Sequence, residues 1–248
     1  MGRLVVLSGP SCAGKGPLCA ALEKYHPELG SRLEKLVLHN SRAMRPVESD
    51  GVDYHFRSRE EIEALRADPG FAVMDVRGDL QALDLAGLEC SLEAGDVLFE
   101  GNPFTGVHIL ESEAASRVEV LGIFLAPFSR AEIVRLKAPE SGVNLSEFTA
   151  EVMRRKILRR TGRQKGRVPE EDLADVERRC TSALGELALA HRFDYVIPNH
   201  DGEDSENWFD FGYPIGDALR ALQCFAALLN GEVPAAVEKW DPGLVPGS

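Results

Sequence analysis

The stretch RLVVLSGPSCAGKGPLCAALEKY, residues 3–25, joins an apolar run, a glycine-rich turn and an amphipathic segment. The apolar run predicts a strand over 3–8, and the segment from Lys15 onward predicts a helix. Between them, Gly9, Gly14 and Lys15 have the Gly-x4-Gly-Lys spacing of a phosphate-binding loop. A simple glycine turn with a surface lysine is the alternative, but strand, turn and helix in this order favour the phosphate loop.

The candidate phosphate loop consists of Gly9, Pro10, Ser11, Cys12, Ala13, Gly14, Lys15 and Gly16. Glycines let such a loop wrap around an anion with its amides pointing inward, and the helix N-terminus adds positive potential. The lysine reaches the terminal phosphates of a nucleotide. These residues therefore predict a nucleotide site in which Lys15 contacts the terminal phosphates.

Three positions depart from the usual loop. Gly16 stands where a Ser or Thr hydroxyl would contact the metal, and Pro17 has no N–H to donate. Losing one charge-assisted hydrogen bond costs about 1.5–3 kcal/mol, so we expect a weakened site. Cys12 lies where glycine would be easier if φ is positive. Two interpretations of the Cys12 thiol stay open. The surrounding amides and Lys15 lower its pKa, and ATP then protects it from alkylation. Alternatively, the thiol is an inert, packed side chain.

Composition limits the class of protein. The 248 residues carry a net charge of −12 and no apolar run of membrane-spanning length, which disfavours nucleic-acid and membrane partners. Five scattered cysteines favour reduced thiols, and six histidines lack the spacing of a zinc site. We expect a cytoplasmic protein without a structural metal ligand set.

One basic segment contrasts with the acidic whole. RRKILRRTGRQKGR, residues 154–167, contains basic residues and no acidic one. A solvated helix face explains most charge runs, while an arginine-rich segment that closes over phosphates is the functional alternative.

Apolar strands alternate with helices along the chain. Strands are predicted over 71–76, 96–100, 118–127 and 193–199, and helices over 58–67, 84–95, 145–160, 172–190 and 214–229. This alternation predicts an α/β fold with a parallel sheet covered on both faces. The segment after residue 231 is predicted to be irregular, and we leave its last five residues, LVPGS, out of the fold prediction.

Two further stretches resemble a known family. In NSRAMRPVESDGVDYHF, residues 40–56, the residues Arg42, Arg45, Glu48, Gly51, Asp53 and Tyr54 keep the spacing of the acceptor-binding stretch of guanylate kinases. In residues 177–199, Arg179, Glu186 and Asn199 match that family's closing helix and strand. With the phosphate loop, the resemblance covers residues 3–200.

The resemblance implies a three-layer P-loop NTPase fold with a parallel sheet, formed by residues 1–231. It implies an acceptor-binding subdomain over 38–95, a lid over 138–175 and an irregular tail over 232–248. It also implies ATP and Mg²⁺ as cofactors and transfer of a phosphoryl group from ATP to GMP, a small phosphorylated acceptor. No protein ligand of the metal is assigned, and the oligomeric state is not predicted.

The resemblance also assigns roles to residues. Arg42, Arg45 and Tyr54 would hold the acceptor's phosphate, and Asn199 would lie near the adenine. Lid arginines would close over the reaction, with Arg154, Arg155, Arg159 and Arg179 as candidates. The proposed catalytic set is Lys15, Arg42, Arg155 and Arg179.

The base-binding part departs from the family. Leu38, Gln81 and Leu83 replace polar residues, and the acid that reads guanine is missing near Val73, with Asp75 as its nearest substitute. Glu100 and Asn102 replace two aspartates, and Glu100 also lies where such folds keep an acid near the metal. The remaining acceptor candidates are Asp75, Gln81, Glu100 and Asn102.

Two alternative functions stay open: a kinase for another phosphorylated metabolite or modified nucleotide, and a non-catalytic binding domain.

Overall fold

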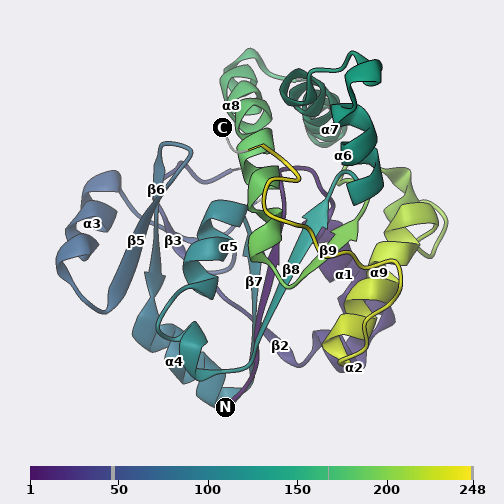
Figure 1. Ribbon diagram of the computed structural model, residues 1–248. Helices are drawn as coiled ribbons and strands as arrows, with labels where there is room; N and C mark the ends of the chain where they lie inside the picture. Colours follow the sequence, from purple (N-terminus) through teal and green to yellow (C-terminus); the bar gives the residue numbers. More distant parts are fainter. Residues whose placement is uncertain (46–47, 167, 247–248) are drawn as a thin grey trace. The chain divides into compact units, whose positions relative to one another are not determined.

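The computed structural model describes residues 1–45, 48–166 and 168–246 (Figure 1). Arg167, the last residue of the basic segment, lies outside the described residues, as do two residues of the predicted subdomain (46–47) and two of the tail (247–248). The chain folds into two compact units. We call residues 1–6, 32–100 and 104–121 the hairpin unit, and residues 7–31, 101–103 and 122–248 the loop unit.

The strands form two sheets. A five-stranded sheet has the order β2-β7-β1-β8-β9, with β2 at Leu33–Lys35, β7 at Asp96–Gly101, β1 at Leu4–Ser8, β8 at Val120–Ala126 and β9 at Tyr195–Pro198. Its pairs β2–β7 and β8–β9 are parallel. A four-stranded sheet has the order β4-β3-β6-β5, with β4 at His55–Phe56, β3 at His39–Asn40, β6 at Asp79–Asp84 and β5 at Phe71–Val76.

The hairpin unit is organised around the antiparallel pair β5–β6, in which Val73 is opposite Ala82. Helix α3 (Arg59–Ala64) covers one face, where Ile62 packs on Leu80 and Ala82. The helix predicted from residue 58 begins with a capping box, in which the Ser58 hydroxyl accepts from the Glu61 amide and the Glu61 carboxylate accepts from the Ser58 amide. The unit's other elements are η1 (Leu65–Ala67), α4 (Leu85–Ala94), most of α5 (Pro103–Leu110) and η2 (Ala115–Arg117).

The loop unit contains α1 (Lys15–Tyr25), α2 (Pro27–Gly30), α6 (Arg130–Lys137), η3 (Pro139–Ser141), α7 (Leu145–Lys165), α8 (Glu170–Ala188), η4 (Leu189–Arg192), η5 (Glu206–Trp208) and α9 (Gly216–Leu229). Helices α7 and α8 pack along one another, and α9 packs on α1 and β9. Phe124 of β8 and Phe193 meet edge to face in the core. The predicted helix that begins at Lys15 is confirmed.

The tail after α9 is irregular but packed. Its Glu238 exchanges two backbone hydrogen bonds of 2.8 Å with Val196 of β9, and the ring of Trp240 lies 6.4 Å from that of Phe124. Leu244 and Val245 are buried as well. Leaving LVPGS out of the fold was therefore wrong for these two residues, because composition does not reveal burial against distant residues.

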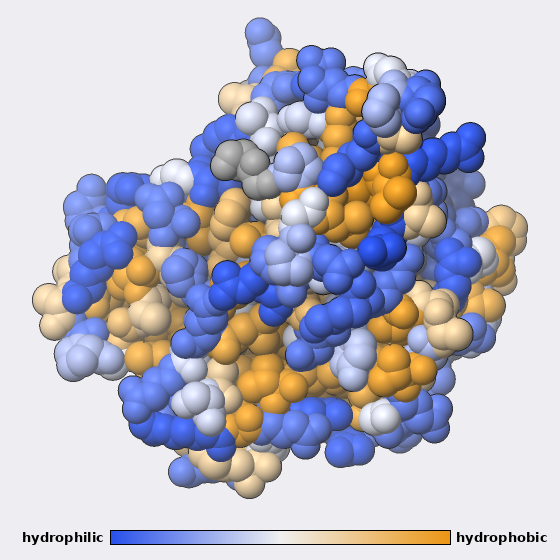
Figure 2. All heavy atoms as spheres, viewed as in Figure 1, coloured by the Kyte–Doolittle hydropathy of each residue, from blue (hydrophilic) through white to orange (hydrophobic). Residues whose placement is uncertain are grey.

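Hydrophilic side chains occupy much of the face seen in Figure 2, with hydrophobic areas among them. In the ranges that the structure describes, every helix is too short or too polar to cross a bilayer.

Candidate functional site

The phosphate loop wraps tightly between β1 and α1. Gly14 has φ 103°, and Cys12 has a left-handed φ of 65°. A Cβ at Gly9 would lie 2.4 Å from the carbonyl oxygen of Leu125, and one at Gly14 would lie 2.6 Å from the Asn199 side chain. Both glycines are therefore required by their surroundings. The Nζ of Lys15 donates to the carbonyl oxygens of Gly9 and Pro10, both at 2.9 Å, so the ammonium lies over the loop.

The Cys12 side chain leaves the loop and enters the core between two helices. It clusters with Met153 and Ile157 of α7 and with Val176 and Cys180 of α8. Burial raises the pKa of the Cys12 thiol, and the charge of a nearby carboxylate, Glu203, adds to the effect. The expectation of a lowered pKa is wrong, and the packed-thiol alternative describes the residue. The cysteine fastens the loop to α7 and α8.

The position after the lysine provides no metal ligand. Gly16 is exposed, and nothing lies within 4 Å of where its Cβ would be. Pro17 is buried in the first turn of α1. Among the residues described, no group of three or more His, Cys, Asp or Glu side chains is arranged to hold a metal ion. That part of the chain thus does not offer Mg²⁺ a site built from such protein ligands.

Asn199 follows β9 and is fully buried behind the loop. Its Nδ2 donates to the carbonyl oxygens of Ala13 at 2.8 Å and Asp201 at 2.6 Å. The side chain thereby ties the phosphate loop to the segment after β9. Contact with an adenine, which the family resemblance implies for Asn199, stays a prediction.

The segment 200–208 lies against the phosphate loop and was not predicted as part of the site. The carboxylate of Glu203 accepts from the Gly14 amide at 3.0 Å. Asp204, which is buried, lies 3.6 Å from Lys156 and 3.8 Å from Arg159 of α7. The only sequence signal was the acidic run DGEDSE, residues 201–206, directly after the strand that ends at Asn199.

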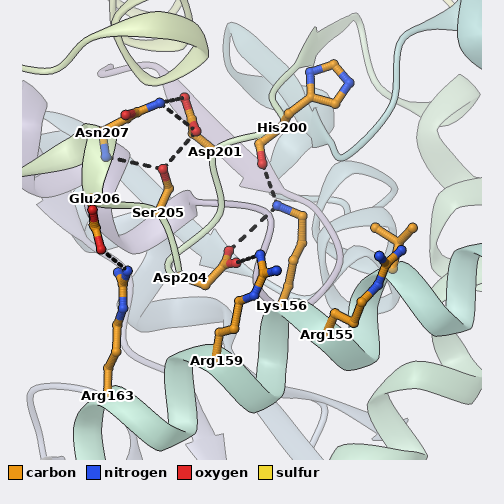
Figure 3. A pocket seen from close by; sticks show the side chains of 11 residues that line it. Arg155, Lys156, Arg159, Arg163, His200, Asp201, Asp204, Ser205, Glu206 and Asn207 are labelled. Carbon is orange, nitrogen blue, oxygen red and sulfur yellow. Dashed lines mark hydrogen bonds and ion pairs between the residues drawn. The ribbon is translucent and has the colours of Figure 1, made fainter.

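A pocket of about 430 Å³ opens between α7 and this segment. Figure 3 shows Arg155, Lys156, Arg159 and Arg163 projecting from one side of α7 toward residues 200–207. The pocket is therefore lined by cations on the helix and by carboxylates on the segment. This arrangement suits an anionic ligand that replaces the internal carboxylates.

The four lid arginines differ in placement. Arg155 and Arg159 line the pocket, whereas Arg154 and Arg179 are not among its lining residues. Arg154 bonds to Glu177 at 2.7 and 2.8 Å, and these hydrogen bonds raise its pKa. Arg179 is buried and pairs with Asp175 one turn earlier on α8.

In the hairpin unit, the three residues predicted to hold the acceptor phosphate lie together. Arg42 binds Glu48 through two hydrogen bonds of 2.7 and 2.6 Å, and Arg45 donates its amide to Glu48 at 2.9 Å. The Arg42 guanidinium lies 5.1 Å from the ring centre of Tyr54. Burial alone would raise the pKa of Glu48, but the bonds to Arg42 and Arg45 outweigh it and lower that pKa. In this cluster the Arg42 guanidinium is therefore already paired with an internal carboxylate, that of Glu48.

The β5–β6 register separates two candidates. Asp75 is opposite Leu80, and Gln81 is opposite Met74. Because side chains alternate between the faces of a strand, Asp75 and Gln81 lie on opposite faces of the hairpin. Asp75 is exposed and bonds to the Gly78 amide at 3.1 Å, whereas buried Gln81 accepts from Thr105 at 2.9 Å. One base cannot contact both side chains.

The same alternation corrects the expected base pocket. Val73 is opposite Ala82 on the α3 face, and Leu83 is opposite Ala72 on the other face. Placing Val73 and Leu83 in one pocket was therefore wrong, because a shift of one residue turns a side chain to the other face. The residues that share a face with Gln81 and Leu83 are Ala72 and Met74.

The last two candidates lie at the end of β7, where Gly101 separates them. Asn102, in the loop unit, donates to Glu186 at 3.1 Å, and the same carboxylate oxygen accepts from Ser182 at 2.7 Å. Glu100, in the hairpin unit, lies close to Tyr54. Burial raises the pKa of the Tyr54 phenol, and the negative charge of Glu100 raises it further. These contacts leave the roles of Glu100 and Asn102 as predictions.

Comparison with known proteins gives consistent similarities. The guanylate kinase family model matches residues 1–70. Curated guanylate kinases from Synechococcus sp. (strain JA-3-3Ab) and Thiobacillus denitrificans are 34% and 32% identical to this chain, over 82% and 81% of it and 78% and 79% of their own lengths. That of Shewanella denitrificans is 30% identical, over 82% of this chain and 83% of its own length.

A solved structure supports the fold. The crystal structure of guanylate kinase from Anaplasma phagocytophilum aligns with a TM-score of 0.52 at 19% identity, over 95% of this chain and 88% of that one. The predicted α/β P-loop fold with a parallel sheet is confirmed.

Proposed function

This chain belongs to the guanylate kinase family, and we propose that it transfers a phosphoryl group from ATP to GMP, giving ADP and GDP. The observation that carries the proposal is the phosphate loop, whose glycines and lysine keep both the spacing and the wrapped backbone of an anion site. Retention of Lys15, Arg42 and Arg45 argues against a purely non-catalytic binding domain.

In the loop unit, the ATP phosphates would lie on residues 9–16. Lys15 would exchange its bonds to two backbone carbonyls for bonds to phosphate oxygens, which are stronger because both partners are charged. Arg155 and Arg159 would add positive charge from α7. Phosphoryl transfer needs positioning and electrostatic stabilisation rather than a covalent nucleophile, and these groups supply both.

In the hairpin unit, Arg42, Arg45 and Tyr54 would hold the phosphate of the acceptor. A dianionic phosphate would take the place of Glu48 on the Arg42 guanidinium, which can bind it through two parallel hydrogen bonds. The phenol of Tyr54 lies beside that guanidinium and can donate a further bond.

Magnesium enters the proposal with the nucleotide. Mg²⁺ in kinases is held largely by substrate phosphates and water, so it can be used without a group of three or more His, Cys, Asp or Glu side chains arranged to hold it, which the described residues do not contain. We also propose a cytoplasmic location, which suits a chain whose five cysteines are all reduced thiols.

The β5–β6 hairpin favours a second class of phosphate acceptor besides GMP. The face of β5–β6 that carries Gln81 and Leu83 also carries Ala72 and Met74, and the Gln81 carbonyl is already bonded to Thr105. This face therefore offers little to the polar edge of guanine, and another phosphorylated metabolite or modified nucleotide is the second candidate acceptor.

The test is an assay of ADP formation with ATP, Mg²⁺ and separate acceptors: GMP, AMP and several sugar phosphates. The Lys15→Ala variant, purified in parallel, controls for contaminating kinases. GMP-dependent turnover supports the first proposal, and turnover of another acceptor alone supports the second. Absence of turnover with every acceptor contradicts both.

A further inference from the structure

We propose that Glu203 is an internal competitor for the ATP phosphates and lowers the affinity of the nucleotide site. The inference rests on the proposed function, since it assumes that ATP binds the phosphate loop. The observation behind it is the 3.0 Å hydrogen bond from the Gly14 amide to the Glu203 carboxylate. While the Gly14 amide donates to this carboxylate, it cannot donate to a phosphate oxygen.

The contact is built into the packing around the loop. A Cβ at Gly202 would lie 2.1 Å from the Cys12 carbonyl oxygen, so glycine lets the segment approach the loop backbone to backbone. On the other side, Trp208 is 1% exposed and would meet a Cβ on Gly14 at 3.2 Å. The segment from Asp201 to Trp208 therefore encloses the loop closely around the point where Glu203 binds.

Internal hydrogen bonds fix the backbone of this segment. The carboxylate of Asp201 accepts from Ser205 at 2.8 Å and from Asn207 at 3.0 Å (Figure 3). It also accepts from the Ala218 amide at 3.0 Å. The indole of Trp208 donates to the carbonyl oxygens of Asp201 and Gly202 at 2.9 and 3.1 Å. Because these bonds do not involve the Glu203 side chain, that half-buried carboxylate can rotate away while the segment keeps its shape.

Charge makes the competition stronger than the lost hydrogen bond alone. Near a protein surface the effective dielectric constant is well below that of water, so two negative charges in contact repel strongly and phosphate and carboxylate exclude one another. The neighbouring cations Lys156 and Arg159 lie 3.6 and 3.8 Å from Asp204, so each is already close to another carboxylate. Measured ATP affinity is then reduced by the fraction of molecules in which Glu203 still occupies the loop.

The experiment measures the dissociation constant of Mg·ATP by titration calorimetry for the wild-type chain and three variants. Glu203→Gln removes the charge, and we expect it to bind ATP at least about 10-fold more tightly, as for loss of one charged competitor. Glu203→Asp keeps the charge on a shorter side chain, and we expect a smaller gain. Asp210→Asn is the control, because Asp210 is an exposed acid in the same part of the chain, and its affinity should match wild type.

A second measurement reports the contact itself. In nitrogen-15 spectra recorded at one pH, the Gly14 amide resonance of Glu203→Gln should be displaced from its wild-type position, and that of Asp210→Asn should stay there. Equal or weaker ATP binding by Glu203→Gln, with wild-type binding measurable, overturns the inference while leaving the proposed function intact. Absence of ATP binding by every variant contradicts both proposals.

Discussion

The phosphate loop and the β5–β6 hairpin have departed from the family pattern in different ways. The loop has replaced a hydroxyl residue by Gly16 and placed Cys12 at a left-handed φ, yet its backbone still wraps and its lysine still lies over it. The hairpin pairs without a break from Phe71 to Val76, and the face that carries Gln81 and Leu83 is mostly apolar.

The difference follows from which atoms do the binding. A phosphate loop recognises its ligand mainly with backbone amides, which every residue except proline provides, so substitutions weaken the site without removing it. A base is recognised by side-chain groups that match its polar edge, so each substitution changes the ligand that fits. The loop should therefore keep its activity while the hairpin loses its selectivity.

The largest expected effect tests the loop. Lys15→Ala removes the one side chain that the loop contributes to transition-state charge, and we expect kcat to fall about 100- to 1,000-fold. Thermal unfolding should change little, since the Lys15 ammonium bonds to carbonyls of its own loop. Lys24→Ala, an exposed lysine at the end of α1, is the matched control and should keep wild-type turnover. Comparable turnover in Lys15→Ala would remove the loop from the mechanism.

The next prediction tests the hairpin. Apolar contacts discriminate between ligands by only about 10- to 200-fold, whereas matched hydrogen bonds reach about 10⁴–10⁵. We therefore expect kcat/KM for GMP to exceed that for AMP by less than about 200-fold. A ratio of several orders of magnitude would show that polar groups outside this hairpin face read the base.

Arg42→Met separates phosphate binding from base binding within the hairpin unit. Loss of a charged hydrogen-bonding partner should raise KM for the acceptor about 10- to 100-fold, with KM for ATP unchanged. Arg66→Met is the control, because Arg66 pairs with Glu63 on the exposed side of α3. Since Arg42→Met also leaves Glu48 without its bidentate partner, unfolding curves of both variants should accompany the kinetics. Equal acceptor KM values in the two variants would contradict the assigned role of Arg42.

The smallest expected effect is a gain in the loop. Gly16→Ser returns the hydroxyl to a position with no atom within 4 Å of the new Cβ, so the substitution fits without strain. We expect about 10-fold tighter binding of Mg·ATP and no change for ATP without the metal, because the hydroxyl acts on the ion. Equal gains with and without Mg²⁺ would show that the serine stabilises the loop instead.

Local patterns predicted the fold better than the site. The glycine loop before α1 and the start of the helix predicted from residue 58 depend on neighbours in sequence, and both formed as expected. Short strands such as β3 and β4 have two residues each and carry no periodicity, so they were not predicted. The contact between Gly14 and Glu203 joins residues 189 positions apart, and only the folded chain reveals it.

The tail after α9 has a consequence for how copies of the chain behave toward one another. Strand β9 is the last in its sheet, and an unpaired edge of this kind invites a strand from another molecule. The bonds between Val196 and Glu238 occupy that edge, and the indole of Trp240 donates to the Glu238 carboxylate at 2.7 Å and holds the tail in place. The segment around Glu238 therefore shields this edge of the sheet from pairing with a second molecule.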